Sequence, residues 1–297
     1  MIYTQGGLPA VPQPQLQEVV NETGFPALAF DKMGKGRLFY DVVLCKATFR
    51  LADGTLGLDE QQALCLADQY WDPAAAQRSS LRVANDAVLY KPGTDVLVTG
   101  SARTPARVPR ARWDGGVVIA RGDKMLAQHG LHFSGPRHWQ YRWTRGWKLS
   151  AAEPVLEVAM RHENAWGGRH TDDQRVLVNP AGCGAYDTAS LDPELEYRAP
   201  QLELPGKVHK AMGQIHQLAA MAPMPPFWLE RQRYAGTYDA AWQAQFARQS
   251  LPDYPSDFDV RFYHYAIPSL RVTPYLTGVE TIHLLGMVPG YRRPSAA

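Results

Sequence analysis

Glycine and proline recur too often in this chain for long helices to form. The 297 residues include 25 Gly and 23 Pro, which separate short runs rich in β-branched and aromatic side chains. Gly and Pro interrupt helices, whereas β-branched and aromatic side chains suit a pleated surface. We therefore expect a mainly β protein, either an antiparallel β-sandwich or two packed β-sheets, with one or two short helices and long loops.

The clearest strand signal covers residues 38–51, a run without Gly or Pro that predicts a central strand. Asp114-Gly115 lies between two extended runs and predicts a hairpin turn. The same reasoning predicts further strands at 87–91, 95–104, 125–133, 139–147, 155–160, 260–266 and 281–287.

Two segments have helical character. Residues 237–249 can form a helix capped by Thr237 or Asp239, with Trp242 and Phe246 on one face. Residues 208–221 are a second candidate, although they include Gly213. We expect one β-rich unit over 1–297 with its core at about 17–290, an irregular surface loop at about 179–226 and a frayed tail at 289–297.

The charge balance and the cysteines limit the classes of function that this chain can have. The formal net charge of +2 gives no global field to hold a nucleic acid or an anionic membrane. Cys45, Cys65 and Cys183 are far apart, which predicts neither a disulfide framework nor a thiolate zinc site. The sequence has no leader pattern at its start and no membrane-spanning apolar run, so we expect a cytoplasmic protein.

No catalytic signature is present: the sequence lacks GxSxG, HExxH, a P-loop and a GxGxxG that follows a strand. A metal site of histidines and carboxylates can be imagined, but the spacing fits no compact motif, and we expect no metal and no cofactor. The residues concerned are Asp123, His129 and His132 in one group and His162, Glu163, His170 and Asp172 in another.

Asp257 and Asp259 flank Phe258 and would project from one face of an extended segment as a carboxylate pair. Such a pair could serve as general acid and base. The alternative, which we favour, is that both carboxylates accept hydrogen bonds from backbone amides or from an arginine such as Arg261.

The densest aromatic and basic segment is 137–148, which contains Trp139, Trp143 and Trp147. It can form the buried face of a sheet, an interface with aromatic anchors, or a stacking platform for single-stranded nucleic acid. The near-neutral total charge argues against the last of these, and whether the segment is core or interface stays open.

Three glycine-centred motifs are the most distinctive feature, and their first role is to fix backbone geometry. They lie at 164–168, 179–184 and 233–242. Together with the residues above they define the candidate structural or partner-binding set: Trp139, Trp143, Trp147, Trp166, Gly167, Gly168, Asn179, Gly236, Thr237, Tyr238, Asp239, Trp242, Asp257 and Asp259.

In their order along the chain, these motifs resemble the domain of unknown function 2169 family. The matching pieces include Lys91-Pro-Gly-Thr-Asp95, Trp166-Gly-Gly168, Asn179-Pro180 and Asp257-Phe-Asp259, and the most specific is Arg233-Tyr-Ala-Gly-Thr-Tyr-Asp239 with Trp242. The chain departs from the family pattern at Gly135-Pro-Arg-His-Trp139 and at Cys183.

Members of that family look like adaptors or chaperones for type VI secretion effectors. The resemblance implies a non-enzymatic protein that binds an effector with a PAAR repeat or toxin domain, with the secretion spike protein as a second candidate partner. Together with the charge balance, we expect it to bind neither nucleic acid nor membrane. The alternative is a carbohydrate-binding or hydrolytic β-sandwich domain, motivated by Glu163, Asp257, Asp259 and the many tryptophans.

Overall fold

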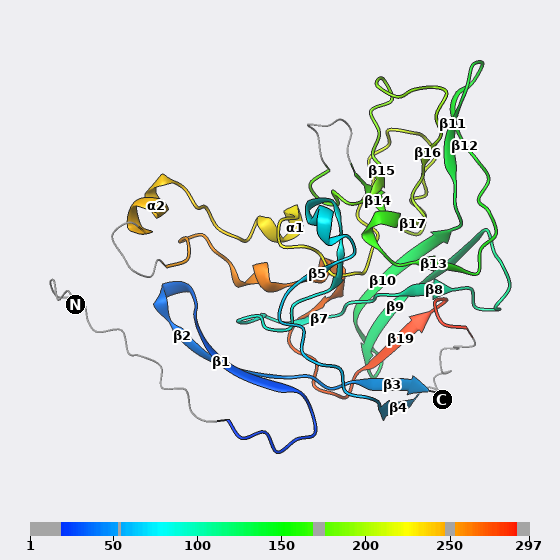
Figure 1. The fold of residues 1–297 in the computed structure, drawn as a ribbon. Coiled ribbons are helices and arrows are strands. Elements are labelled where there is room, and N and C mark those ends of the chain that lie inside the picture. The colour runs from blue at the N-terminus through cyan, green and yellow to red at the C-terminus, as the bar shows by residue number, and fades with distance from the viewer. Residues whose placement is uncertain (1–18, 53–54, 169–175, 247–252, 290–297) are drawn as a thin grey trace. The chain divides into compact units, whose positions relative to one another are not determined.

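The computed structural model describes residues 19–52, 55–168, 176–246 and 253–289. Strands far outnumber helices and most strand pairs are antiparallel, which confirms the mainly β fold class (Figure 1). The chain divides into two compact units. Unit 1 combines Met1–Leu64 with Tyr238–Ser256, and unit 2 combines Cys65–Thr237 with Asp257–Ala297. No feature of the sequence predicts this division within the single unit expected for residues 1–297.

Unit 1 contains two β-hairpins. β1 (Ala27–Met33) pairs with β2 (Phe39–Cys45) across a 3-10 helix, η1 (Lys35–Arg37), and β3 (Phe49–Ala52) pairs with β4 (Thr55–Leu58). The run at 38–51 therefore belongs to two hairpins, and its prediction as one central strand is wrong. The strand breaks before Thr48, whose amide donates to the side chain of Gln61 at 2.9 Å and makes no ladder bond there.

The helix predicted at 237–249 is present in unit 1 as α2 (Ala240–Phe246). A carboxylate oxygen of Asp239 accepts a hydrogen bond from the amide of Trp242 at 2.9 Å. Asp239, and not Thr237, is therefore the capping residue. Residues 247–249 of the predicted helix lie outside the described residues.

The main sheet of unit 2 has four strands in the order β17-β10-β9-β19. Its two long strands, β9 (Arg112–Arg121) and β10 (Lys124–Ser134), form an antiparallel hairpin. β17 (Leu202–Glu203) and β19 (Thr281–Leu285) add one edge each.

Asp114-Gly115 does not form the predicted hairpin turn, because both residues lie inside β9. The chain turns instead at Gly122, whose φ is 56°, and Asp123. Gly115 and Gly116 allow close approach: a Cβ on Gly116 would lie 2.4 Å from the carbonyl oxygen of His129, and one on Gly115 would lie 2.6 Å from that of Leu285.

The other strands of unit 2 are short. A three-stranded sheet has the order β12-β11-β16, and the remaining strands form pairs, of which β14 with β15 is parallel. Their bounds are β5 Gln69–Tyr70 with β6 Leu81–Val83, β7 Thr94–Asp95 with β18 Arg271–Val272, β8 Ser101–Arg103 with β13 Glu157–Ala159, β11 His138–Arg142, β12 Gly146–Leu149, β14 Trp166–Gly167, β15 Cys183–Gly184 and β16 Tyr197–Arg198.

Helices in unit 2 are equally short. Residues 260–266, predicted as a strand, begin with a 3-10 helix because the side chain of Asp259 accepts the amide of Arg261 and caps it. Residues 208–221 form no helix, and Gly213 takes a φ of 77°. The bounds are α1 Leu229–Gln232, η2 Pro73–Arg78, η3 His162–Asn164, η4 Val260–Tyr263 and η5 Pro268–Leu270.

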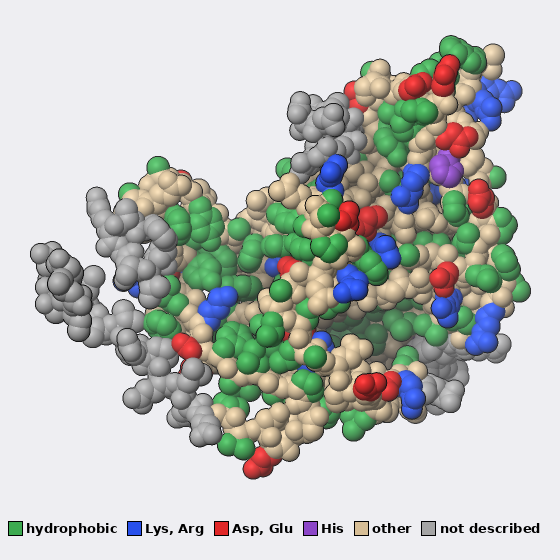
Figure 2. Space-filling model, in the orientation of Figure 1, with side chains coloured by type: hydrophobic (Ala, Val, Ile, Leu, Met, Phe, Trp, Pro, Cys, Tyr) green, Lys and Arg blue, Asp and Glu red, His purple; other side chains and the backbone are tan. Residues whose placement is uncertain are grey.

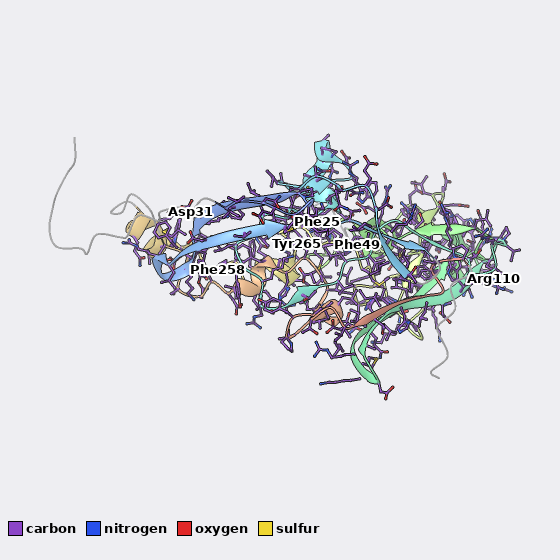
Figure 3. The ribbon with its side chains drawn as sticks, turned by 90° about the horizontal axis from the view of Figure 1, so that it is seen from below. Phe25, Asp31, Phe49, Arg110, Phe258 and Tyr265 are labelled. Atoms are coloured by element: carbon purple, nitrogen blue, oxygen red, sulfur yellow. The ribbon has the colours of Figure 1, made fainter. Side chains whose placement is uncertain are left out.

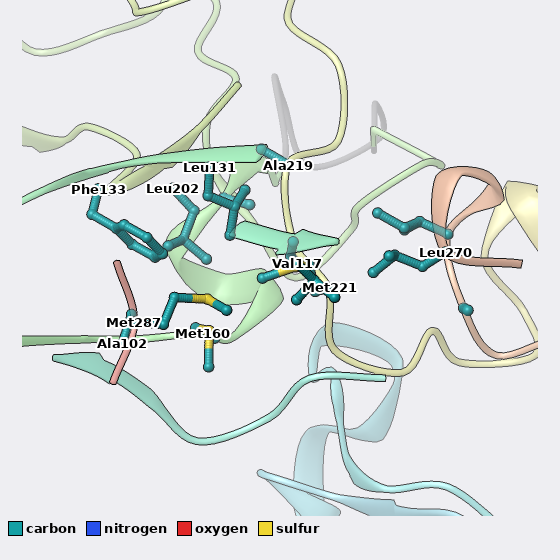
Figure 4. Packing of buried hydrophobic residues seen from close by; sticks show 14 of the residues in the cluster. Ala102, Val117, Leu131, Phe133, Met160, Leu202, Ala219, Met221, Leu270 and Met287 are labelled. Carbon is teal, nitrogen blue, oxygen red and sulfur yellow. The ribbon is translucent and has the colours of Figure 1, made fainter. Parts of the chain in front are cut away.

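The hydrophobic core of unit 2 lies against the main sheet. Val117 and Ile119 of β9 and Leu131 and Phe133 of β10 are fully buried, and Met160, Leu202, Met287 and Leu270 pack with them (Figure 4). The alternation of buried residues along β10 matches the period of two that a one-sided sheet requires.

An irregular segment completes this core. Residues 179–226 contain only three two-residue strands within the described chain, as the Gly and Pro content predicts. However, they do not all lie at the surface, since Ala219, Ala220, Met221, Ala222 and Met224 are at most 2% exposed. The backbone of this segment bonds to other parts of the core: Val98 donates to the carbonyl of Met221, and Met224 donates to that of Tyr265.

We predict that Met221→Ala lowers the unfolding free energy of unit 2 by about 2–5 kcal/mol, because it leaves a cavity at a fully buried position. Chemical denaturation measures the change. The matched control is Ile215→Ala in the same segment, whose side chain is 78% exposed and whose truncation should cost less than about 0.5 kcal/mol. Equal losses for the two variants would contradict the placement of the segment.

Candidate protein-binding surface

Unit 1 exposes an apolar face on its second hairpin. The pairing register sets Phe49 opposite Leu58 and Leu51 opposite Leu56, so the four side chains share one face of the β3–β4 hairpin. All four are between 46% and 72% exposed. Figure 3 labels Phe49 on this hairpin. We call these four residues the β3–β4 face.

No large hydrophobic side chain described in unit 1 is buried. The interior of unit 1 is instead held by polar contacts: Gly36 donates to the carboxylate of Asp253, Lys35 donates to the carbonyl of Ser256, and the indole of Trp242 donates to the carbonyl of Asp253. Apolar burial is the main source of folding free energy. The described part of unit 1 therefore has regular strands but no hydrophobic core of its own.

The β1–β2 hairpin also has a sheet edge on each side without a strand partner among the described residues. Two-stranded hairpins are marginally stable in water, and their open edges can pair with another strand. Asp31 lies directly opposite Asp41, and like charges in such a pair are destabilising. The hairpin therefore has open edges that a further strand can pair with, and such pairing would increase its stability.

The motif at 233–242 spans the point at which the chain passes from unit 2 into the segment 238–256 of unit 1. The amide and hydroxyl of Thr237 donate to the two carboxylate oxygens of Asp257, at 2.9 and 2.6 Å. These residues stand directly before and after residues 238–256, which belong to unit 1. Gly236 has a φ of 82°, and Tyr238 packs edge-on against Trp242 at 4.8 Å. The motif closes the base of this segment.

The two candidate acidic residues are engaged in structural hydrogen bonds. Asp257 binds Thr237 as described, and Asp259 accepts from the amide, Nε and Nη2 of Arg261 at 2.6–3.0 Å. This confirms that the carboxylates bond to backbone amides and to Arg261.

The motifs at 164–168 and 179–184 lie side by side in unit 2. β14 and β15 run parallel, and the side-chain amide of Asn179 donates to the carbonyls of His162 and Trp166 at 2.9 and 3.0 Å. A Cβ on Gly167 would lie 2.2 Å from the carbonyl oxygen of Asn179, and Gly168 has a φ of 99°. These glycines let two backbones touch.

The aromatic segment 137–148 divides between core and surface. Trp139 is 1% exposed, whereas Trp143, at the turn of the β11–β12 hairpin, is 84% exposed. Tyr141 contacts Trp143 and Trp147 edge-on at 5.6 and 5.3 Å. Hydrophobic, acidic and basic side chains gather at the end of this hairpin (Figure 2). Edge-on rings offer no continuous flat platform for stacked bases.

Arg137 lies in the segment Gly135-Pro-Arg-His-Trp139, which departs from the family pattern at Pro136, and the Arg137 side chain is buried. It pairs with the buried carboxylate of Glu203 at 2.7 Å, and Glu203 also accepts from the ring and the amide of His209. Burial alone would raise the pKa of Glu203, but the hydrogen bond from His209 and the charge of Arg137 lower it. Arg137 therefore supports the core. Cys183, the other departure, lies in β15 and is buried enough to raise its pKa to about 11.

The residues considered as metal ligands are dispersed. His132 binds Asp114, Glu163 accepts from the amide and hydroxyl of Ser80, and Nε2 of His162 donates to the carbonyl of Ala222. Over the residues that the structure describes, no group of three metal-ligating side chains is found; His170 and Asp172 lie outside them. The three cysteines are not disulfide-bonded.

These features define a mainly β protein with exposed strands and a compact core in its larger unit. A family model described as "Uncharacterized protein conserved in bacteria (DUF2169)" matches residues 37–296, and the chain belongs to this family. No curated protein and no solved structure matches it. Among the described residues, no helix has the length and apolarity needed to cross a membrane.

We predict that unit 2 loses stability as the pH falls from about 6.5 to about 4. Burial lowers the pKa of His162 from 6.5 to about 4, so in this range the unfolded state binds a proton that the folded state excludes. The loss from this group is on the order of 3 kcal/mol. Burial also lowers the pKa of His129 and of His216, which adds in the same direction.

Urea denaturation at a series of pH values measures this dependence. His162→Gln should give a visibly shallower decline than the parent protein. A His162→Gln variant with the parental slope would show that this ring does not titrate as described.

Proposed function

We propose that this protein is a non-enzymatic adaptor in the cytoplasm that binds a type VI secretion effector carrying a PAAR repeat or toxin domain. It holds the effector in a soluble form and helps to load it onto the secretion spike. The secretion role rests on the family resemblance of the motifs. The polypeptide-binding role is supported by the β3–β4 face, which is the single observation that carries it.

A client strand or apolar segment provides what unit 1 lacks. Contact with Phe49, Leu51, Leu56 and Leu58 would remove their exposed area from water, and each fully buried side chain of this kind contributes about 1.5–3 kcal/mol. The edges of the β1–β2 hairpin would supply main-chain hydrogen bonds, as in strand addition. Both interactions are tolerant of sequence, which suits a chaperone.

No specific observation favours the carbohydrate-binding or hydrolytic alternative. Its acidic residues, Glu163, Asp257 and Asp259, all have structural partners. Trp139 is in the core, and Trp143 contacts Tyr141 edge-on and does not form a flat platform with it.

We predict that the double variant Phe49→Ser with Leu58→Ser lowers affinity for the effector encoded beside this protein by at least tenfold. Loss of two apolar contacts exceeds the 1.4 kcal/mol that corresponds to a factor of ten. Co-expression, affinity capture and titration of the purified complex measure the change, and the amount of soluble effector should fall with it.

The matched control is Leu156→Ser with Leu195→Ser, which removes apolar side chains of 53% and 56% exposure from unit 2. It should leave the complex and the soluble effector unchanged. If the effector is equally soluble and equally secreted without the adaptor, the proposed function is wrong.

A further inference from the structure

Unit 2 contains a cavity of about 630 Å³. Its wall is mainly apolar and includes Leu204, Ile215, Leu218 and Ile267. The exposed residues Pro268 and Ser269 lie at its rim. Cavities of this size and character are typical of sites that bury a ligand.

Three ring nitrogens in the wall of this cavity have no hydrogen-bond partner among the described residues. They are Nε1 of Trp166, Nε2 of His129 and Nε2 of His216, and each is itself buried. Trp166 is 5% and His129 8% exposed. An unsatisfied buried donor costs about 1–3 kcal/mol, and the indole N–H of Trp166 is such a donor, so it indicates a ligand that satisfies it.

The indole fixes the chemistry, because its N–H can only donate. The ligand must therefore present an acceptor oxygen. His129 already has its Nδ1 bonded to the hydroxyl of Ser269 at 2.9 Å, and its Nε2 can donate in the tautomer that accepts there. Among the described residues of the cavity wall, the only ionised side chain is Glu230, which pairs with Arg233. This described wall offers no cation to an anion, so the acceptor oxygens that fit it are neutral, like those of amides.

The wall also offers unpaired backbone. Residues 215–218 form no helix or strand, and none of their backbone amides or carbonyls has a hydrogen-bond partner among the described residues. A small ligand with one carbonyl could engage at most one or two of these groups. An extended peptide carries donors and acceptors at the spacing that such a segment can use.

We infer that this cavity binds an extended, uncharged segment of the client polypeptide, with an apolar side chain inside and a main-chain carbonyl on the indole N–H of Trp166. The inference rests on the proposed function and adds to it a second site, in unit 2, with a stated chemistry. Binding there selects for an apolar residue next to accessible backbone, as occurs in an unfolded or marginally stable client.

The first test is NMR of the full chain with 15N-labelled tryptophan. The indole resonance of Trp166 is assigned by its loss in Trp166→Phe, and that of Trp139 by its loss in Trp139→Phe. Trp139 is the matched control because its indole N–H is also buried without a partner but lies outside the cavity wall. The probes are N-acetyl-leucinamide, N-acetyl-glycinamide and N-acetyl-leucine.

N-acetyl-leucinamide should shift the Trp166 resonance downfield in a saturable way and leave Trp139 unchanged. N-acetyl-glycinamide, which lacks the apolar side chain, should bind at least tenfold more weakly. The inference is overturned if no probe shifts Trp166, or if the carboxylate of N-acetyl-leucine is preferred over the amide.

A blocked tripeptide, acetyl-Ala-Leu-Ala-amide, distinguishes a peptide from a small carbonyl compound. It should bind more tightly than N-acetyl-leucinamide and should also shift the backbone amide signals of residues 215–218. Weaker binding than the single residue would overturn the peptide assignment.

The last step uses Val178→Trp, which fills the cavity from its half-buried wall, against Leu177→Trp at the adjacent exposed position. Val178→Trp should abolish the NMR shifts and weaken effector capture at least tenfold, whereas Leu177→Trp should do neither. Unchanged capture with Val178→Trp overturns this inference and leaves the proposed function in place, since the β3–β4 face is intact. If the parent protein captures no effector, the proposed function itself has failed.

Discussion

The side-chain amide of Asn179 links two backbone segments of unit 2, at His162 and at Trp166, by hydrogen bonds. Its two hydrogen bonds to the carbonyls of His162 and Trp166 require both backbones to approach it closely, which glycine at 167 and 182 permits. His162 in turn contacts the carbonyl of Ala222 and packs edge-on against Trp228 at 4.7 Å. One buried polar residue thus connects the core segment 219–224 with the indole that lines the cavity.

The two units differ in how they are stabilised. Unit 2 has a continuous apolar core, whereas the described part of unit 1 is held by cross-strand pairs and polar contacts. Since apolar burial supplies most of the free energy of folding, a unit that exposes its apolar side chains gains the most when another chain covers them. That gain is the physical basis for assigning the client contact to the β3–β4 face.

Local pattern predicts part of this structure and misses what depends on distant residues. The alternation along β10 and the cap of α2 by Asp239 are local signals, and both are present in the structure. Asp114-Gly115 has the same local pattern as a hairpin turn, yet its glycine serves contacts with β10 and β19, which no short window contains. Likewise the role of residues 238–256 in unit 1 depends on a partner segment about 200 residues earlier in the chain.

The candidate residues divide in the same way. Gly167, Gly168 and Asn179 were recognisable as backbone-shaping because glycine and asparagine have few other reasons to cluster with an aromatic residue. The β3–β4 face gives no such signal, since Phe49 and Leu51 look like ordinary strand residues until their exposure is known. The cavity is harder still, because it combines His129, Trp166 and residues 215–218 from separate parts of the chain.

The two proposed binding sites lie on one chain, which changes the affinity that each would need. In this proposal a client held at the β3–β4 face would reach the cavity at an effective concentration set by the connecting chain, often in the millimolar range. The cavity therefore needs only weak intrinsic affinity to contribute, and weak affinity for short apolar segments is what neutral donors and an apolar wall provide. Binding at two weak sites would also permit release. A client that folds, or that binds another partner, would dissociate from one site at a time, so the combined affinity would fall in steps.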